Sequence, residues 1–344
     1  MTDSISSTKV LVTGANGFIG LHTTLRLLHL GYLVRATVRT ETNKKNVIET
    51  LSKQLDTSKL EFALADLARD EGWKEAVQGC NYVIHIASPY LAENPKDENE
   101  VILPARDGTL RVLKAAQLAG VKRMVMLSSV VAISSGHARE NRTFDENDWS
   151  DLGKTRAVYN KSKTLAESAA WDFIRSAENK SGMEMVAINP TNVFGPVLDG
   201  HYHTSTEWYR TIMRAESPGV SRTQMDLVDV RDLVEVMIKA LTIPEAAGKR
   251  FICNGASIPL KEFADILHDN FASRGFRVPN RILPDFLIRS MGMFMPKIKA
   301  VADNLQWEPA FSTQQVQKVF GWQPHPYKQT IIEMAESLIE FGLV

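Results

Sequence analysis

The stretch that most constrains the fold is "KVLVTGANGFIG", residues 9–20. The run "KVLVT" predicts a buried strand, and it leads directly into Gly14, Gly17 and Gly20 at G-x-x-G-x-x-G spacing. The apolar pattern of 18–31 predicts a helix that begins in this loop. Such a loop presents the free N–H groups of a helix N-terminus to a phosphate. A glycine turn that serves packing alone is the weaker interpretation in this context. The expected dinucleotide contacts in the loop are Gly14, Asn16, Gly17, Phe18, Ile19 and Gly20.

Short apolar runs alternate with helical patterns through the first half of the chain. Strands are predicted at 9–13, 33–39, 60–66, 81–87, 122–129 and 183–190, with helices at 18–31, 42–54, 71–79, 98–119 and 157–177. This βαβα alternation predicts an α/β fold, a Rossmann-type doubly wound parallel sheet. We expect residues 1–190 to form the dinucleotide-binding domain, with the chain returning to it near 225–255, and 191–344 to form mainly a smaller C-terminal substrate-binding lobe.

Composition narrows the class of protein. The 344 residues are 44% hydrophobic and 23% charged, as in globular proteins, and 40 basic residues balance 40 acidic ones. This balance favours neither nucleic acid nor an anionic membrane as a partner. Cys80 and Cys253 fit no metal-ligand spacing and no disulfide framework. Neither a signal peptide nor an apolar run of the ~20 residues of a membrane span is evident, so we expect a cytoplasmic monomer or homodimer.

The end of the second predicted strand bears on the choice between NAD and NADP. A carboxylate there would accept the ribose hydroxyls of NAD, whereas a cation accommodates the 2′-phosphate of NADP. The strand ends at Arg39, Lys44 and Lys45 follow, and the nearest acid, Glu41, lies two residues into the loop. The planar guanidinium suits a phosphate monoester, so we predict NADP(H). The two lysines fit a solvated helix equally well.

A second constellation is the pair Tyr159 and Lys163 in "VYNKSKTLAE", residues 158–167. Four residues along a helix place both side chains on one face. Tyrosine titrates near ~10, so a neighbouring cation that favours its phenolate makes it a better acid and base. A surface tyrosine beside a solvated lysine is the alternative. Against it, none of the other tyrosines has a lysine four residues later, and the pair follows the glycine loop and a strand-end serine, Ser129.

Three stretches together, "TGANGFIG", "LSSVVAI" and "YNKSKTLAE", resemble the extended short-chain dehydrogenase/reductase superfamily. "NEVILPARDGTLRVLKAA", "INPTNVFGP" and "GYLVRATVR" narrow the resemblance to the branch of dihydroflavonol reductases, cinnamoyl-CoA reductases, and bacterial and fungal aldehyde/ketone reductases. The similarity covers nearly the whole chain, strongly to about residue 196 and more loosely afterwards. The resemblance implies an NADPH-dependent carbonyl reductase.

The resemblance also implies roles for single residues. Tyr159 would be the proton donor, Lys163 would hold the nicotinamide ribose and lower the pKa of Tyr159, and Ser129 would orient the carbonyl oxygen. A hydroxyl at a strand's carboxyl end can also stabilise the charge that hydride transfer builds on oxygen. Further cofactor contacts are implied at Arg39, Lys45, Asp66, Leu67, Ala87, Ser88, Ser128, Tyr159, Lys163, Pro190, Asn192 and Val193. Taken alone, Asp66 at a strand end is also a common helix cap, and Ser129 a hydroxyl that satisfies local backbone.

The candidate substrate pocket is mostly apolar or aromatic. Its predicted residues are Tyr90, Val131, Phe194, Tyr202 and Met225, with Leu91 and Trp208 as further candidates. They predict a hydrophobic or aromatic carbonyl substrate, although each also fits ordinary packing. The chain has "TRAVYNKSK" where cinnamoyl-CoA reductases carry an aromatic and cysteine-containing run, and it lacks the aromatic signature of plant dihydroflavonol reductases. A generic aldehyde or ketone reductase therefore fits better than either plant activity.

Other functions remain open at the level of sequence. A sugar-nucleotide epimerase or dehydratase and a hydroxysteroid dehydrogenase belong to the same superfamily. Arg39 argues against the retained NAD of an epimerase, although Arg210, Arg214 and Arg222 are candidates to grip a diphosphate. A protein that senses NADP without turnover would not need the serine, tyrosine and lysine together.

Three further features have a structural interpretation. The acidic run 144–151 predicts a solvated loop rather than a metal site. For the Met-rich stretch 284–301, a cover over the pocket or plain core is a better interpretation than a lipid-facing helix. His85, inside an apolar strand, is expected to be a core histidine with satisfied hydrogen bonds.

Overall fold

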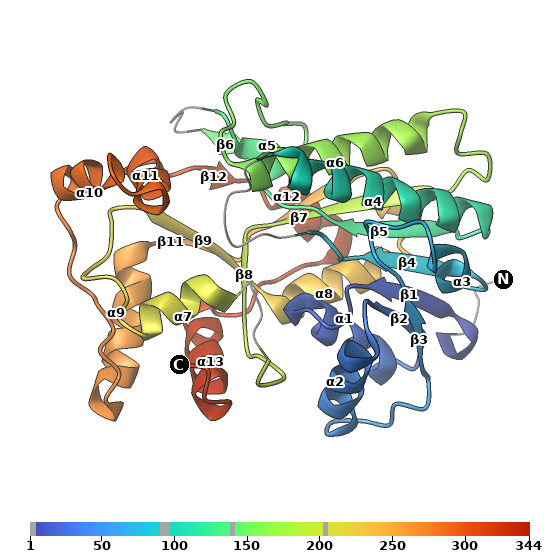
Figure 1. The fold of residues 1–344 in the computed structure, drawn as a ribbon, viewed down its shortest axis with the longest axis horizontal. Helices are drawn as coiled ribbons and strands as arrows, with labels where there is room; N and C mark the ends of the chain where they lie inside the picture. The colour runs from blue at the N-terminus through green and yellow to red at the C-terminus, as the bar shows by residue number, and fades with distance from the viewer. Residues whose placement is uncertain (1–4, 90–96, 138–141, 202–205) are drawn as a thin grey trace.

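The computed structural model describes residues 5–89, 97–137, 142–201 and 206–344. Within them, a parallel sheet runs through the larger part of the molecule in the order β10-β7-β5-β4-β1-β2-β3 (Figure 1). The strand order reverses between β1 and β4, and ligands of such sheets bind in the crevice at this point, outside the strands' carboxyl ends. The strands are β1 (Lys9–Thr13), β2 (Leu33–Val38), β3 (Leu60–Leu64), β4 (Tyr82–His85), β5 (Arg123–Leu127), β7 (Glu184–Pro190) and β10 (Arg250–Cys253).

Helices cover both faces of this sheet, which confirms the predicted fold class (Figure 1). On one face α1 (Phe18–His29) packs against α8 (Val230–Lys239), and on the other α4 (Asn99–Leu118) packs against α6 (Val158–Arg175). The shorter helices around this sheet are α2 (Glu41–Ser52), α3 (Trp73–Val77) and α5 (Val131–Ser134).

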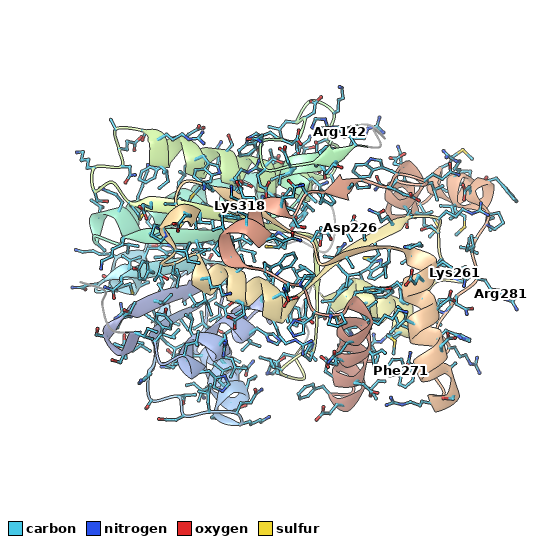
Figure 2. All side chains as sticks on the ribbon, turned by 180° about the vertical axis from the view of Figure 1, so that it is seen from behind. Arg142, Asp226, Lys261, Phe271, Arg281 and Lys318 are labelled. Atoms are coloured by element: carbon cyan, nitrogen blue, oxygen red, sulfur yellow. The ribbon has the colours of Figure 1, made fainter. Side chains whose placement is uncertain are left out.

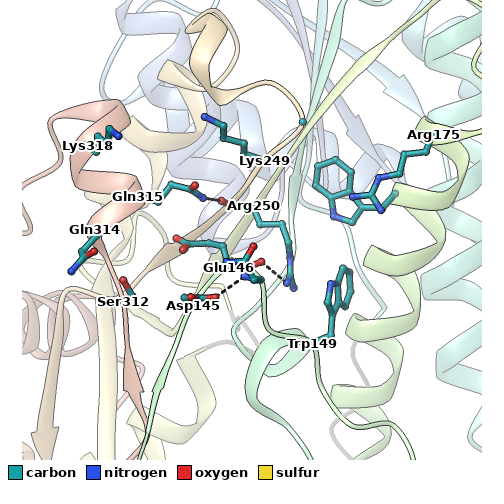
Figure 3. Close-up of a pocket in the computed structure, with 13 residues that line it drawn as sticks. Asp145, Glu146, Trp149, Arg175, Lys249, Arg250, Ser312, Gln314, Gln315 and Lys318 are labelled. Atoms are coloured by element: carbon teal, nitrogen blue, oxygen red, sulfur yellow. Dashed lines mark hydrogen bonds between the residues drawn. The ribbon is translucent and has the colours of Figure 1, made fainter.

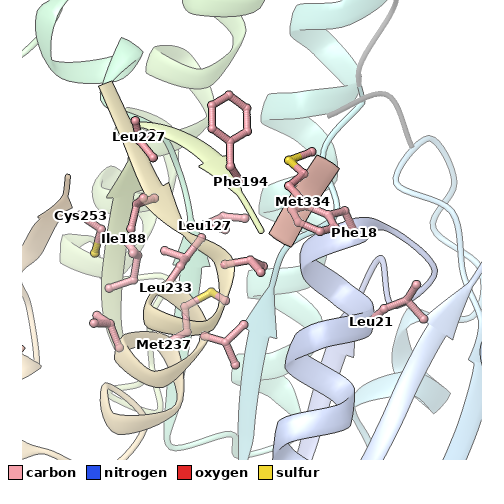
Figure 4. Packing of buried hydrophobic residues seen from close by; sticks show 14 of the residues in the cluster. Phe18, Leu21, Leu127, Ile188, Phe194, Leu227, Leu233, Met237, Cys253 and Met334 are labelled. Atoms are coloured by element: carbon pink, nitrogen blue, oxygen red, sulfur yellow. The ribbon is translucent and has the colours of Figure 1, made fainter. Parts of the chain in front are cut away.

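The apolar strands explain why two helical layers form. In β1, Val10 and Val12 pack with α1, whereas Leu11 between them packs with the side of α4 and α6. Successive side chains of a strand point to opposite faces, so an uninterrupted apolar strand needs cover on both. Figure 4 shows the first of these layers, in which Phe18 and Leu21 of α1 and Leu127 of β5 belong to one buried cluster.

A smaller lobe lies beside the carboxyl ends of the large sheet (Figure 1). Its sheet has the order β11-β9-β8, in which β8 and β9 are parallel and β9 and β11 antiparallel. Viewed from behind, Lys261 and Phe271 mark its helix α9, whereas Lys318 marks α12 against the large sheet (Figure 2). The elements of the lobe are β8 (Asn192–Phe194), α7 (Glu207–Met213), β9 (Gln224–Asp229), β11 (Ala256–Pro259), α9 (Leu260–Phe271), α10 (Asp285–Gly292), α11 (Pro296–Asp303) and α13 (Tyr327–Glu340). The helix α12 (Gln314–Phe320) packs instead against β10 and α8.

The acidic run 144–151 differs from the predicted solvated loop. Its first residue, Phe144, is fully buried and belongs to a short strand, β6 (Thr143–Phe144), which pairs with β12 (Ala310–Phe311). Glu146 is partly buried, and its carboxylate accepts a hydrogen bond of 3.1 Å from the backbone N–H of Ile252. The run therefore packs against the edge strand β10, because backbone groups there need partners.

The Met-rich stretch 284–301 is not plain core. It forms two short helices, α10 and α11, and Met293 and Phe294 between them are 73% and 83% exposed. Ile288 is the buried contact on α10. In the part of the chain that the structure describes, no helix is both long and apolar enough to cross a membrane.

Candidate cofactor and catalytic site

The glycine loop between β1 and α1 has the geometry that a bound diphosphate requires. Gly14 adopts a left-handed conformation with φ of +69°, and a Cβ there would lie 3.0 Å from the Cα of Ala87. A Cβ at Gly20 would lie 2.2 Å from the carbonyl oxygen of Gly14, so helix and loop touch at that point. At Gly17 the nearest atom would be 3.4 Å away. Gly17 therefore leaves open the side from which a phosphate approaches the helix N-terminus.

The other predicted loop residues divide by burial. Asn16 and Ile19 are half-buried at the loop, whereas Phe18 is 3% exposed and packs in the core beside Leu21 (Figure 4). The side chain of Phe18 is thus committed to packing. Its predicted contact with the cofactor rests on its backbone, in keeping with anion binding by helix N–H groups.

A buried hydrogen-bond chain fixes the loop to the neighbouring strand. The hydroxyl oxygen of Thr13 accepts from the backbone N–H groups of Ile86 and Ala87, each at 3.0 Å. Its own hydrogen is thereby directed to Nδ1 of His85, 2.9 Å away, and Nε2 of His85 donates to Thr109 at 3.3 Å. Burial and the charge of Lys163 lower the pKa of His85 to about 3. His85 is therefore a neutral core histidine, as predicted.

Positively charged side chains lie at the end of β2, where the 2′-phosphate of NADP would bind. Arg39 follows β2 directly and is exposed, and Lys45 is exposed on α2. Neither side chain has an ion pair or hydrogen bond among the described residues. Lys44 instead pairs with Glu41 at 3.4 Å, so the nearby acid is already engaged. This arrangement fits an anionic group and disfavours the ribose hydroxyls of NAD.

Asp66 and Leu67 follow β3. One carboxylate oxygen of Asp66 accepts from the backbone N–H of Ala68 at 2.9 Å, which closes a turn. Asp66 is not a helix cap, because the next helix, α3, begins at Trp73 with Gly72 as its N-cap. The side chain stays half-buried. Leu67 lies against α4, where a Cβ at Gly108 would come within 2.7 Å of it. The adenine contacts of both residues remain predictions.

Tyr159 and Lys163 lie at the start of α6, as the helical spacing predicts. Tyr159 is half-buried in the first turn, and Lys163 one turn later is only 5% exposed. The Lys163 ammonium group donates to the carbonyl oxygen of Leu127 at 3.2 Å, at the carboxyl end of β5. Burial lowers the pKa of Lys163 to about 8, and the negative charge of Glu167 opposes this shift. A buried, charged lysine is thus held at the strand ends where ligands bind.

The two serines after β5 differ in accessibility. Ser128 is 3% exposed, and its hydroxyl donates to Glu167 at 2.5 Å. Ser129 is half-buried, and among the described residues its hydroxyl makes only long contacts, 3.3 Å from the backbone N–H of Val131 and 3.5 Å from the carbonyl oxygen of Pro190. The hydroxyl of Ser129 is therefore the one that can turn to a substrate. A cofactor contact of Ser128 would fall to its backbone, because its side chain is occupied.

The predicted nicotinamide contacts surround the same edge. Ala87 lies against Gly14, and Ser88 next to it is half-buried. Pro190 ends β7, and its carbonyl oxygen accepts from Val130 at 3.0 Å. Asn192 is exposed, with its amide donating to the carbonyl oxygen of Asp226 at 2.8 Å, and Val193 is half-buried. Their contact with a cofactor remains a prediction.

The predicted substrate residues do not all line an open surface. Phe194 is 3% exposed within an aromatic cluster, 6.0 Å from the ring of Trp208 and 5.6 Å from that of Phe263. It packs in the core, and Trp208, 38% exposed, is the accessible member of the cluster. Met225 is 8% exposed beside Asn192, and Val131 is half-buried next to Ser129. Tyr90, Leu91 and Tyr202 lie outside the described residues.

Sequence reasoning missed the buried groups behind the site. Glu167 of α6 binds Ser128, Asn189 and Arg250. Glu167 is itself the last residue of "VYNKSKTLAE", four after Lys163, and this spacing was a usable signal. Asn189 and Arg250 carry no comparable signal, because they lie 22 and 83 residues after Glu167 and approach it only once β7 and β10 have paired in the sheet.

Known proteins identify the family of this chain. The profile of the NAD dependent epimerase/dehydratase family matches residues 10–254. This chain belongs to that family. A bifunctional dihydroflavonol 4-reductase/flavanone 4-reductase from Malus domestica is 34% identical over 321 residues, which cover 91% of this chain and 85% of that protein. The chain therefore belongs to the dihydroflavonol-reductase-like branch of the extended short-chain dehydrogenases/reductases, as predicted, and is an oxidoreductase.

Solved structures agree on the fold. Yeast methylglyoxal/isovaleraldehyde reductase Gre2 complexed with NADPH has a TM-score of 0.82 at 24% identity, covering 97% of this chain and 99% of that one. Gre2 in complex with NADPH from Candida albicans has a TM-score of 0.80 at 27% identity, with the same coverage. Both neighbours carry NADPH, in agreement with the predicted cofactor NADP(H).

The arginines considered for a diphosphate are engaged elsewhere. Arg210 and Arg214 donate to the carbonyl oxygen of Leu343 at 2.9 and 2.8 Å, and Arg222 pairs with Asp285 at 3.4 Å. These contacts do not favour the epimerase alternative. In the described part of the chain, no group of three His, Cys, Asp or Glu side chains is arranged to hold a metal ion.

Proposed function

We propose that this protein is an NADPH-dependent carbonyl reductase that acts on hydrophobic or aromatic aldehydes and ketones in the cytoplasm. The observation that carries the proposal is the arrangement at the end of β5. There the half-buried Ser129 follows the strand, and the buried ammonium group of Lys163 donates to the carbonyl oxygen of Leu127 at the same strand end, with Tyr159 one helical turn before the lysine. Two free, buried cysteines suit a reducing compartment.

The residues present fit the dinucleotide. The backbone at Gly17 and the N-terminus of α1 would hold the diphosphate, Arg39 and Lys45 the 2′-phosphate, and Lys163 the nicotinamide ribose. When bound, NADPH supplies the hydride that the reduction requires.

The chain's own groups handle the charge and the proton. As negative charge develops on the carbonyl oxygen, the hydroxyl of Ser129 donates a hydrogen bond to it. The phenol of Tyr159 transfers its proton to the same oxygen and gives the alcohol. The positive charge of Lys163 stabilises the phenolate that remains.

The first experiment follows NADPH and NADH absorbance with a panel of carbonyl compounds. The panel contains the compounds named for the relatives, a dihydroflavonol, methylglyoxal and isovaleraldehyde, together with aromatic and aliphatic aldehydes and ketones. We expect oxidation of NADPH with at least one hydrophobic or aromatic carbonyl. The absence of oxidation of either cofactor across the panel would contradict the proposed activity.

The second experiment tests the proton donor. Tyr159→Phe is expected to reduce kcat by about 10²–10⁴-fold, because a positioned general acid contributes that much, while NADPH still binds. Tyr327→Phe is the matched control, since its hydroxyl bonds Glu262 on α9 and lies outside the site. Full turnover by Tyr159→Phe would refute the assigned mechanism without affecting the family assignment.

A further inference from the structure

Glu167 is a buried acid one helical turn beyond Lys163. Its side chain is fully buried in α6, between the large sheet and the helical layer that contains α4. A buried carboxylate is costly unless donors surround it. Here they do: it accepts from the hydroxyl of Ser128 at 2.5 Å, the guanidinium of Arg250 at 2.6 Å, the amide of Asn189 at 2.8 Å and the indole N–H of Trp171 at 3.2 Å.

Two of these contacts extend to the residues after β5. The amide nitrogen of Asn189 donates both to Glu167 and, at 3.1 Å, to the carbonyl oxygen of Ser129. The hydroxyl of Ser128 binds Glu167 directly. Within the described part of the chain, the hydroxyl of Ser129 itself has only long contacts, so its position follows from its backbone. Backbone hydrogen bonds of 2.8 Å from Ser128 to Ile188 and 3.0 Å from Val130 to Pro190 tie this segment to β7. Asn189 and the Ser128 side chain, both bound to Glu167, add a second set of contacts to it.

The charge of Glu167 also faces Lys163. On α6 the ionisable neighbours of Lys163 are Tyr159 and Glu167, each one turn away. From β4 it is faced by His85, which is neutral because of burial, and from β5 by the carbonyl oxygen of Leu127. Arg250 of β10 lies on the other side of Glu167. Burial lowers the pKa of Lys163 and Glu167 raises it, so Glu167 is the negative charge that favours the ammonium form.

Arg250 holds Glu167 in place. Figure 3 shows Arg250 beside Trp149 and Glu146, at a cavity of about 520 Å³ on the edge of the sheet. Its guanidinium lies 3.9 Å from the ring centroid of Trp149 and donates to the carbonyl oxygens of Glu146 and Asp148 at 3.1 and 2.5 Å. A buried ion pair adds little stability compared with apolar residues of the same volume. A role in fixing the site accounts for an ion pair at this place.

We propose that Glu167 is a positioning residue of the catalytic site, which fixes the backbone of Ser129 through Asn189 and presents a negative charge to Lys163. The inference rests on the proposed function, because that function gives Ser129 and Lys163 their roles. On this proposal, the buried Glu167 and the residues that face the crevice together set the pH range of activity.

The test is Glu167→Gln, which keeps the size of the side chain and removes its charge. The pH dependence of kcat/KM and that of the NADPH dissociation constant, followed by nicotinamide fluorescence, are measured from pH 6 to 10. In the parent protein, kcat/KM is expected to fall and the NADPH dissociation constant to rise as Lys163 loses its proton near pH 8. In the variant, this alkaline limb of both pH profiles is expected to lie roughly one pH unit lower, because an opposite charge one turn from Lys163 has been removed. We also expect kcat to fall about tenfold with little change in KM, because Ser129 is less well held.

Glu184→Gln is the matched control. Glu184 of β7 also pairs with a buried arginine, Arg123 at 2.6 Å, and touches none of the site residues. Its pH profiles are expected to superimpose on those of the parent. If Glu167→Gln does not fold because Arg250 is left unpaired, the double variant Glu167→Gln/Arg250→Gln replaces it, and the limb is again expected to move to lower pH.

The outcomes separate this inference from the proposed function. Folded Glu167→Gln, or the folded double variant, with both pH profiles unchanged would overturn the role of Glu167 while leaving the reductase activity intact. If the parent protein oxidises NADPH with none of the carbonyls, the proposed function fails. The pH dependence of NADPH binding then still decides whether Glu167 acts on Lys163.

Discussion

Arg39 is predicted to set the preference for NADPH over NADH, and Arg39→Ala tests this directly. The side chain is exposed just after β2 and has no partner among the described residues. Its removal should therefore leave the free energy of unfolding nearly unchanged, within about 0.5 kcal/mol, as for most surface substitutions. Any large effect then belongs to the cofactor.

The magnitude follows from the interaction that is lost. A hydrogen bond to a charged group contributes about 1.5–3 kcal/mol, and 1.36 kcal/mol corresponds to a factor of ten. Loss of the contact between Arg39 and the 2′-phosphate is therefore expected to raise the NADPH dissociation constant about 10- to 150-fold. NADH lacks this phosphate, so its affinity should stay within about twofold. Lys45→Ala should have a smaller effect, since a flexible ammonium group binds as a point charge.

The assay measures both dissociation constants by nicotinamide fluorescence and kcat/KM with both cofactors. Lys53→Ala is the control, because it removes an exposed positive charge at the other end of α2. It separates the specific contact from a general change in the surface field. An unchanged ratio of NADPH to NADH affinity in Arg39→Ala would show that another group reads the 2′-phosphate.

Three further predictions concern the loop, the lysine and the lobe. Gly20→Ala is expected to lower both Tm and NADPH affinity, because its Cβ would lie 2.2 Å from the carbonyl oxygen of Gly14. The control Gly79→Ala has φ of +72° and open space around it, and should cost only about 1–2 kcal/mol in thermal unfolding. Equal losses of stability in the two variants would contradict the close packing at Gly20. The pKa of Lys163 of about 8 predicts that reduction rates hold below pH 8 and fall above it, as the ammonium group loses its proton, and a flat profile to pH 10 would contradict this. In steady-state kinetics, Trp208→Ala is expected to raise KM for aromatic carbonyls by several-fold and to leave KM for small aliphatic carbonyls unchanged. The reason is that Trp208 is the exposed ring of its cluster and can stack on an aromatic substrate. An equal change in KM for both classes of substrate would argue against an aromatic subsite.

The main sheet could be predicted from the sequence because its strands are buried and are therefore apolar along their length. The run 9–13 coincides with β1, and the run 183–190 differs from β7 by one residue at its start. Strands covered on both faces are continuously apolar, and this pattern is local. The helix that contains Tyr159 and Lys163 was equally visible, since its polar and apolar positions repeat within one segment.

Elements whose partners are distant in the sequence were not predictable in the same way. The short strand β6 forms only because β12, more than 160 residues later, pairs with it. β8 begins two residues after β7 ends and has only three residues, too few for a pattern of its own in the sequence. Phe194 illustrates the consequence for the site, because an aromatic residue after a strand can point to a ligand or into the core. Here Trp208 and Phe263 enclose it.

The surroundings of Lys163 show why the catalytic pair alone does not define the site. A buried ammonium group loses hydration, and the pKa of Lys163 falls from 10.5 to about 8 as a result. If His85 beside it also took up a proton, the two like charges would repel; burial keeps His85 neutral, and its bonds to Thr13 and Thr109 need no charge. Glu167, one turn along, carries the compensating charge. A neutral neighbour on one side and an anion on the other thus allow Lys163 to remain charged near neutral pH, the state in which it can act on Tyr159.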